Sequence, residues 1–381
     1  MIIGVTGTKG KTTICSMLHH CFVFFKKDVA SFTTIGARKN ETAFKLQDPS
    51  LSDLSNLLVD DAQNKILEMT SFCLELSFFD ASKPDCVIMT GIEQDEHTEI
   101  HDSFNDYLDA KKRIFKIRKP GAKALVCRDD KSFHKIAAGV QDIYTYGFDE
   151  NSDCVLKIDK MNPSGMAITL TCPDVVKIKT KLLGRHNAAN IAACYLALIE
   201  SGFEKKQAIK AIEKFSGVEG RFERFEIRSR KTTKTVLIDY AHTPRSLQIN
   251  LELVRKIFPN KSICTVFGCG GNKSQEKRPK MGEVVEKLSD FAILTNDNPR
   301  KENPLVIISH ILGGMTKRHQ VEQDRKSAIR LAIESNADVV FLAGKGSEDY
   351  YIDAEGYHPN MSDSKLLTAV CAEKKFTLKK I

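Results

Sequence analysis

The chain has 381 residues, of which 42% are hydrophobic and 28% are charged, proportions that are ordinary for a globular protein of two or three domains. No segment combines the length and the apolarity of a membrane span. The formal net charge of +8 comes from widely spread lysines, without a basic stripe interleaved with aromatic residues, so it favours anionic small molecules over nucleic acid as partners.

The eleven cysteines are scattered from Cys15 to Cys371 and include no C-x-x-C pair. This distribution argues against a disulfide framework and against a structural zinc site, and it predicts buried thiols in a reducing compartment. The N-terminus goes directly into an apolar run and lacks the cationic start of a signal peptide. We therefore expect a cytoplasmic protein, and we expect it to be a monomer.

A glycine-rich stretch, GVTGTKGKTT, occupies residues 4–13. The apolar run MIIGV that leads into it predicts a buried strand, and the apolar spacing of TTICSMLHHCFVFF after it predicts a helix. A strand, a Gly-rich turn and a helix are the context of a phosphate-binding loop. We expect the loop to bind the phosphates of ATP and the first helical hydroxyl to bind Mg²⁺, which gives these candidates: Gly7, Thr8, Lys9, Gly10, Lys11, Thr12 and Thr13.

The loop motif departs from the full pattern at one position. Val5 stands where G-x-x-x-x-G-K-[ST] requires glycine, so only the compact form G-T-x-G-K-T-T is present. The alternative is a Gly-rich turn that binds no ligand. It is disfavoured because Gly-Lys-Thr at the start of a helix contributes little to packing.

Strand-like apolar runs alternate with helical stretches along the chain, which predicts an α/β fold with a mainly parallel sheet. In the first part the predicted strands are KILEMTSF, DCVIMTGI and AKALVCRDD. Residues 150–183 change to short alternating segments, which predict an antiparallel patch, and a helical run follows at residues 186–202.

A second set of predicted strands comprises KTVLIDYA, SICTVFGC, FAILTND and ADVVFLAG. Each of them ends in a loop rich in Gly, Asp, Asn or His, and such loops at the carboxyl ends of strands bind ligands in open α/β sheets. The boundary between the two sets is predicted near residues 217–228.

Seven motifs occur in the order that is seen in Mur ligases: GTKGKTT, GRHNAANIAA, GVEGRFE, DYAHTP, FGCGGNKSQEKRPKMG, NDNPRKENP and AGKGSEDY. The chain resembles this family over about residues 2–365, and the last four motifs resemble its tripeptide synthetases. The resemblance implies a central ATP-binding domain at residues 1–220, with a P-loop and a mainly parallel sheet, and a C-terminal Rossmann-like domain at residues 221–381.

Family members of this type have a further N-terminal domain that binds the uridine nucleotide, whereas this sequence begins at the second domain. We expect either that the protein uses a nucleotide-linked substrate without that domain, or that its substrate carries no UDP.

ATP-dependent joining of a carboxylate to an amine needs an acyl phosphate, and this needs magnesium ligands and cations at the carboxyl edge of the sheet. Glu68 lies at the end of one predicted strand, and His97 and His101 follow the next. By resemblance, Thr12, Glu68 and His97 are magnesium contacts. The family writes T-N-x-x-x-D-H here, and this chain has Gly91 and one extra residue, so the position of His97 departs from the pattern. A structural role for His101 and a surface or capping role for Glu68 are the alternatives.

The segment YLDAKKRIF resembles the one that carries a carbamylated lysine in the family, which would be Lys111. Carbamylation turns a cation into an anion that can orient magnesium. From the residues alone, Lys111 beside Lys112 and Arg113 predicts only a solvated helix face.

The resemblance also implies the remaining ATP contacts. His186 and Asn187 of GRHNAAN would lie against the adenine, with an N-cap pair as the structural alternative. Arg221, Asp239 and His242 would reach the same nucleotide, so hinge closure is expected.

The acceptor is predicted from NDNPR and GKGSED, by resemblance to tripeptide synthetases. The D-N-P-R form goes with meso-diaminopimelate, with Arg300 pairing with a carboxylate and Glu348 facing the distal amino group. The substrate-binding residues are then Asp297, Asn298, Arg300, Gly344 and Glu348. Ser347 replaces the usual histidine, which leaves lysine open as the acceptor.

The donor side departs most from the family. Phe72 stands where the V-S-S-H segment has histidine, and LQDPS stands where the family has T-T-P. Three hypotheses therefore remain open: a ligase that adds a diamino acid to a cell-wall peptide precursor, a Mur-type ligase on another carboxylate such as a folate polyglutamate, a cofactor or a pseudomurein-type peptide, and a non-catalytic ATP-binding subunit.

Overall fold

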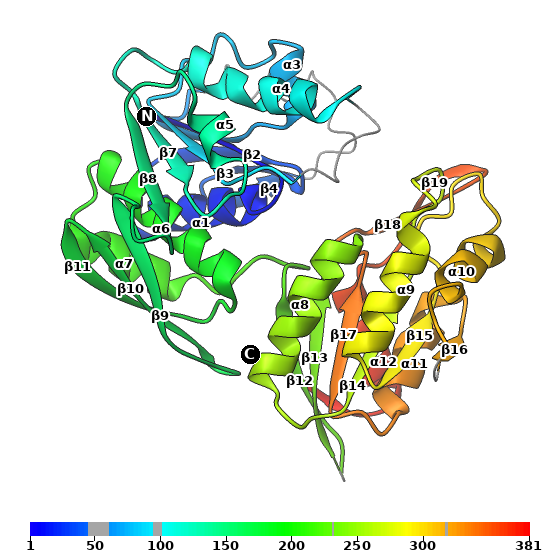
Figure 1. The fold of residues 1–381 in the computed structure, drawn as a ribbon. Coiled ribbons are helices and arrows are strands. Elements are labelled where there is room, and N and C mark those ends of the chain that lie inside the picture. The colour runs from blue at the N-terminus through cyan, green and yellow to red at the C-terminus, as the bar shows by residue number, and fades with distance from the viewer. Residues whose placement is uncertain (45–60, 94–100, 231, 317–318) are drawn as a thin grey trace. The chain divides into compact units, whose positions relative to one another are not determined.

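The computed structural model describes residues 1–44, 61–93, 101–230, 232–316 and 319–381. Within these ranges the chain divides into two compact units, Met1–Gly217 and Val218–Ile381, which we call the first and the second unit. Each unit is a mostly parallel β-sheet with helices packed on it (Figure 1), which confirms the predicted α/β fold class.

The sheet of the first unit has the order β11-β10-β9-β8-β7-β6-β1-β5-β2-β3-β4. Strands from β9 to β2 in this order pair in parallel, and the two ends of the sheet are antiparallel, which confirms the antiparallel patch predicted for residues 150–183. The strands are β1 (Ile2–Thr6), β2 (Val29–Thr33), β3 (Gly36–Lys39), β4 (Thr42–Phe44), β5 (Asn64–Glu68), β6 (Cys86–Met89), β7 (Lys123–Cys127), β8 (Ile143–Gly147), β9 (Cys154–Asn162), β10 (Gly165–Cys172) and β11 (Asp174–Thr180).

Helices cover the central strands of this sheet. Helix α1 packs with α6 and α7, and α3 packs against α4. The core between the sheet and α3 to α5 contains Leu67, Val87, Met89 and Ile114, all fully buried. The helices are α1 (Lys11–Phe24), α3 (Ser71–Glu75), α4 (Phe104–Ile117), α5 (Phe133–Ala137), α6 (Arg185–Glu200) and α7 (Lys205–Lys214).

Strands β1, β5 and β6 are neighbours and parallel, so their carboxyl ends meet at one edge of the sheet. Val5 is paired with Glu68, and Thr6 with Met89. The predicted strand KILEMTSF is too long, because β5 ends at Glu68 and the Thr70 hydroxyl accepts a hydrogen bond from Cys73 N (3.3 Å) to cap α3. A strand and a helix start thus share one apolar run.

The second unit has a sheet of order β16-β15-β14-β17-β13-β12-β20, which is parallel from β16 to β13 and antiparallel at β12 and β20. Helices α8, α9 and α10 pack side by side, and α11 packs against α12. The strands are β12 (Glu223–Arg228), β13 (Thr233–Asp239), β14 (Ile263–Phe267), β15 (Phe291–Leu294), β16 (His319–Val321), β17 (Val339–Ala343) and β20 (Thr377–Lys380), with a separate hairpin of β18 (Tyr350–Asp353) and β19 (Gly356–Pro359). The helices are α8 (Pro244–Ile257), α9 (Lys277–Leu288), α10 (Pro304–Leu312), α11 (Arg325–Glu334) and α12 (Asp363–Glu373).

All eleven cysteines are free thiols, as a chain without a disulfide framework requires. Cys73 is half-buried and the others are buried, so they fill core positions as predicted. No helix in the described ranges is long and apolar enough to cross a membrane.

Candidate active site

The loop between β1 and α1 has the backbone of a phosphate cradle. Gly7 and Gly10 have φ values of 135° and 89°, which favour glycine. A Cβ atom at Gly7 would lie 1.9 Å from Thr90 Oγ1, and one at Gly10 would lie 2.4 Å from Asn190 Oδ1. Gly10 caps α1 without a side-chain hydrogen bond, so the first N–H groups of α1 remain available to an anion.

Lys11 folds back over this loop. Its ammonium donates to the carbonyl oxygens of Gly7 (2.9 Å) and Thr8 (3.0 Å). The Thr8 hydroxyl points away from the loop, where it accepts from Glu93 N (2.9 Å) and bonds with the Tyr107 hydroxyl (2.8 Å). Lys9 is exposed, and its carbonyl oxygen accepts from Thr90 Oγ1 (2.6 Å), so the loop is held from β6 as well.

A hydroxyl and a carboxylate meet at the start of α1. The buried Thr12 Oγ1 donates to Glu68 Oε2 (3.0 Å), and Glu68 also accepts from Thr34 N (3.1 Å) and Thr34 Oγ1 (3.3 Å). Oxygen ligands of this kind suit Mg²⁺, which usually takes one or two carboxylates together with phosphate oxygens. Glu68 is therefore neither a helix cap nor a surface carboxylate. Thr13, the next residue of the motif, is half-buried.

Thr34 was not predicted from the sequence. It follows β2, which is the neighbour of β5 in the sheet, and only this pairing brings it to Glu68. The available signal was the polar Thr33-Thr34 pair directly after the apolar run VASF.

Lys111 of α4 is 1% exposed, so the alternative of a solvated helix face is wrong for this residue. Its Nζ lies 3.4 Å from Thr6 Oγ1 and 5.2 Å from the centroid of the Tyr107 ring. Since Thr6 ends β1 and Tyr107 contacts Thr8, Lys111 lies behind the phosphate loop. Lys112 and Arg113 are half-buried and reach Lys135 O and Asp80 instead.

Of the two histidines predicted after β6, only His101 lies within the described residues. His97 lies outside the described residues. His101 is buried, with Nδ1 3.4 Å from Glu75 Oε2 and its ring 5.3 Å from that of Tyr107, measured between centroids.

His186 and Asn187 lie in the first turn of α6. The N-cap is Gly184 without a side-chain bond, so the predicted alternative of an N-cap pair is wrong. His186 is exposed, while the buried Asn187 donates to Leu183 O (2.8 Å) and accepts from Asn190 Nδ2 (3.2 Å). Through Asn190, which touches Gly10, this turn adjoins the phosphate loop.

In the second unit, Asp239 ends β13 and organises the turn that follows. Its carboxylate accepts from Phe222 N (2.7 Å), Ala241 N (2.8 Å) and Asn250 Nδ2 (2.7 Å). The Tyr240 ring lies 4.3 Å from the Arg221 guanidinium and 4.7 Å from the His242 ring. The structure thus brings Arg221, Asp239 and His242 together.

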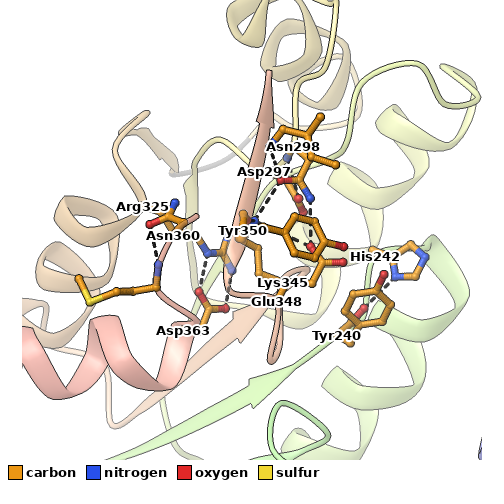
Figure 2. A network of polar contacts seen from close by, with 12 residues as sticks. Tyr240, His242, Asp297, Asn298, Arg325, Lys345, Glu348, Tyr350, Asn360 and Asp363 are labelled. Atoms are coloured by element: carbon orange, nitrogen blue, oxygen red, sulfur yellow. Dashed lines mark hydrogen bonds and ion pairs between the residues drawn. The ribbon is translucent and has the colours of Figure 1, made fainter. Parts of the chain in front are cut away.

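Five residues of the second unit form what we call the Asn298 cluster: Asp297, Asn298, Lys345, Glu348 and Tyr350. Figure 2 shows their side chains converging from the loops after β15 and β17 and from the start of β18. Asn298 Nδ2 donates to Glu348 Oε2 (3.0 Å), and Asn298 Oδ1 accepts from Lys345 Nζ (3.1 Å). Gly344 has a φ of 112°, and a Cβ there would lie 2.8 Å from Asp297 Oδ2.

Burial sets the electrostatics of this cluster. Burial, followed by the nearby Asp297 carboxylate, raises the pKa of Glu348. Burial lowers the pKa of Lys345. Nearby, Arg325 and Asp363 form a bidentate ion pair with contacts of 2.6 and 2.7 Å, and their opposite charges neutralise each other. This leaves Lys345 as the one cation of the cluster beside two carboxylates, those of Asp297 and Glu348. The charge of the cluster therefore favours binding of a further cation.

Arg300 lies on the other side of Asn298. Its NH1 donates to Gly271 O (3.1 Å) and to Asn298 O (3.3 Å), and its backbone φ is 53°. The loop that carries it is fastened to α9 by Arg278, which binds Glu302 with two contacts of 2.8 Å. Arg278 and Lys345 are buried although their charges predict solvent exposure, so the sequence alone does not mark them as site residues.

Family models match the chain at residues 5–198, by the Mur ligase middle domain, and at residues 220–346, by the Mur ligase glutamate ligase domain. The chain belongs to the Mur ligase family. The predicted resemblance is thereby confirmed, and with it the assignment to ATP-dependent amide-forming ligases.

Individual Mur ligases give the same result. UDP-N-acetylmuramoyl-L-alanyl-D-glutamate--2,6-diaminopimelate ligase of Lawsonia intracellularis is 36% identical over 364 residues, which cover 91% of this chain and 74% of that protein. A solved structure of an enzyme of the same name is 27% identical with a TM-score of 0.67, covering 99% of this chain and 79% of that one. Folylpolyglutamate synthase from Thermotoga maritima, 16% identical with a TM-score of 0.66 over 90% of this chain and 85% of that one, shares the fold.

Proposed function

We propose that this Mur ligase joins an amino group of a diamino acid to the carboxylate of a UDP-linked muramoyl dipeptide, with ATP and magnesium, in the synthesis of a peptidoglycan precursor. The 36%-identical relative, named for 2,6-diaminopimelate, supports this pair of substrates. The observation that carries the proposal is the pairing of Glu348 and Arg300 around Asn298.

Glu348 and Arg300 offer opposite charges to one ligand. Asn298 contacts the Glu348 carboxylate through its side chain and the Arg300 guanidinium through its carbonyl oxygen. meso-Diaminopimelate has an ammonium and a carboxylate at its distal end, whereas lysine has only an ammonium there. An arginine fork suits the carboxylate, and a buried carboxylate suits the ammonium. This favours diaminopimelate as the acceptor.

The reaction divides into two steps that conserve every atom. A donor carboxylate oxygen attacks the γ-phosphorus of ATP, so an acyl phosphate forms and ADP leaves. The acceptor amine then attacks the acyl carbon, the amide bond forms, phosphate leaves and the amine gives up a proton.

We assign the first step to the phosphate loop and the carboxyl edge of the first sheet. Lys11 would turn from its loop carbonyls to the outer phosphates, and Thr12 and Glu68 would hold magnesium, as would His97 by the family pattern. When bound, magnesium neutralises charge on the phosphate oxygens. Lys111 would act as a carbamate. His186, Asn187, Arg221, Asp239 and His242 would contact the rest of the nucleotide.

A second candidate is a Mur-type ligase on another carboxylate. It is favoured by Phe72, which replaces the usual histidine and exposes 47% of its surface on α3, four residues after Glu68. An apolar ring in this position cannot hydrogen-bond a muramoyl group, so a different donor would suit it.

The test is phosphate release from ATP with magnesium, UDP-MurNAc-L-Ala-D-Glu and either meso-diaminopimelate or lysine, with each component omitted in turn and the products weighed by mass spectrometry. We expect turnover that requires the donor and diaminopimelate. Turnover with another carboxylate in place of this donor would establish the second candidate. ATP binding without turnover on any carboxylate would establish a non-catalytic subunit.

A further inference from the structure

Lys345 is a buried lysine that the proposed reaction does not use. It is 2% exposed, and its ammonium donates to Asn298 Oδ1 (3.1 Å) and to Tyr350 O (2.6 Å). Glu348 Oε2 lies 3.8 Å from it. Burying an ammonium costs free energy, and an apolar side chain could have filled the same space. We therefore looked for a role for Lys345 in the hydrogen bonds that its ammonium makes.

The first of these contacts determines which way the Asn298 amide points. Asn298 Oδ1 accepts from Lys345 Nζ and from Ile352 N (3.1 Å), and both of these groups can only donate. A flipped amide would set its NH₂ group against two donors. The NH₂ group must therefore face Glu348, as Figure 2 shows.

Glu348 is in turn held by the Asn298 amide. Its Oε2 accepts from Asn298 Nδ2 (3.0 Å) and lies 3.8 Å from Lys345 Nζ. A carboxylate has about four acceptor positions, so the contact with Asn298 leaves others for a ligand. Of the charged groups nearby, Asp297 repels an additional anion and Arg325 is paired with Asp363, so the ligand that fits the remaining positions is a cation.

We propose that Lys345 is a positioning residue of the acceptor site, which locks the Asn298 amide so that Glu348 presents its remaining acceptor positions to the ammonium of the amino acid substrate. The inference rests on the proposed function for the identity of that substrate. Lys345 itself does not touch the substrate and acts through Asn298.

Two variants and one control test this role. Lys345→Met removes the ammonium and keeps the length of the side chain. Asn298→Asp keeps an oxygen for Lys345 and Ile352, loses the donor to Glu348 and places a second carboxylate beside it. Lys261→Met is the matched control, since Lys261 is a lysine of the same unit in an exposed ion pair with Asp338.

We expect Lys345→Met and Asn298→Asp to raise the KM for meso-diaminopimelate about 10- to 100-fold, the loss typical of one hydrogen bond to a charged group. The KM for ATP and kcat at saturating acceptor should stay within about twofold of wild type, because the phosphate site is untouched. Lys261→Met should match wild type. An unchanged acceptor KM in Lys345→Met, with the protein folded, would overturn the proposal.

A measurement on the chain alone separates this inference from the proposed function. The side-chain NH₂ signals of Asn298 in an ¹⁵N-asparagine-labelled sample, identified by their loss in Asn298→Asp, should exchange with solvent at least about tenfold faster in Lys345→Met than in wild type. Equal exchange rates would show that Lys345 does not hold the amide. If wild type fails to use diaminopimelate, the proposed function fails, and the exchange rates still decide whether Lys345 positions Asn298.

Discussion

The Glu68 carboxylate accepts hydrogen bonds from Thr12 of α1 and from Thr34, which follows β2, at the sheet edge where magnesium would bind. Glu68→Gln keeps the size of the side chain and removes its charge. We expect the magnesium concentration for half-maximal turnover to rise about 10- to 100-fold, as it does when the partners of a metal site are altered. Glu200→Gln, which removes one partner of an ion pair with Lys123, is the control. An unchanged magnesium requirement in Glu68→Gln would remove Glu68 from the metal site.

The raised pKa of Glu348 predicts two opposite dependences on pH. Acceptor binding needs the ionised carboxylate, so the KM for the acceptor should fall as the pH rises through the pKa of Glu348. In Glu348→Gln the acceptor KM should be about tenfold higher and should no longer change over this pH range. The contribution of Glu348 to the free energy of unfolding has the opposite dependence on pH. Because the folded-state pKa lies above the unfolded one, the stability that Glu348 contributes is present below its unfolded pKa and is lost as the pH rises through its folded pKa.

Glu348→Gln should therefore gain free energy of unfolding relative to wild type as the pH rises through that window. Denaturant titrations of both proteins at pH 4 to 8, with acceptor KM measured over the range where both stay folded, check the two predictions together. A stability difference that does not change with pH would mean that Glu348 titrates as an ordinary exposed glutamate.

At the level of single residues, the sequence predicts contiguous motifs well and tertiary contacts poorly. The phosphate loop is recognisable because Gly7, Gly10 and Lys11 are neighbours in the chain. Thr34 reaches the site only because β2 pairs with β5. Lys111 and Lys345 have charges that predict solvent exposure, and only packing shows that both are buried.

Arg278 shows how one helix fixes a functional loop. It is fully buried on α9 and holds Glu302 of the loop that carries Arg300. Arg278→Met would leave Glu302 without its partner, and we expect a loss of about 3 kcal/mol in the free energy of unfolding, because Glu302 keeps some contact with water. The KM for the acceptor should rise in the same variant. Arg330→Met, whose exposed pair with Glu373 is worth less than about 1 kcal/mol, is the control for denaturant unfolding.

The elements that the sequence predicted are those with a strong local pattern. The runs from DCVIMTGI to ADVVFLAG contain β6, β7, β13, β14, β15 and β17, because buried parallel strands are apolar on both faces. The lysine-rich end EKKFTLKKI has no clear strand pattern, and yet it contains β20, an edge strand that pairs with β12. Edge strands are often charged on their open side, which weakens their apolar pattern.

For the whole molecule, the alternation of strands and helices was enough to predict two α/β units, because parallel pairing requires a crossover between strands. The order in which the strands lie in each sheet could not be predicted, since it depends on contacts between residues far apart in the sequence.

The buried thiols make the chain a reporter of its own unfolding. Burial raises the pKa of Cys264 to about 12 and that of Cys371 to about 11, so neither is a reactive thiolate until its surroundings open. Cys264, Cys269 and Cys371 belong to the second unit and the other eight to the first. Brief alkylation should modify Cys73 alone in the native protein. In rising denaturant, the added mass of each species would show which unit opens first, because each has its own core and a different number of thiols.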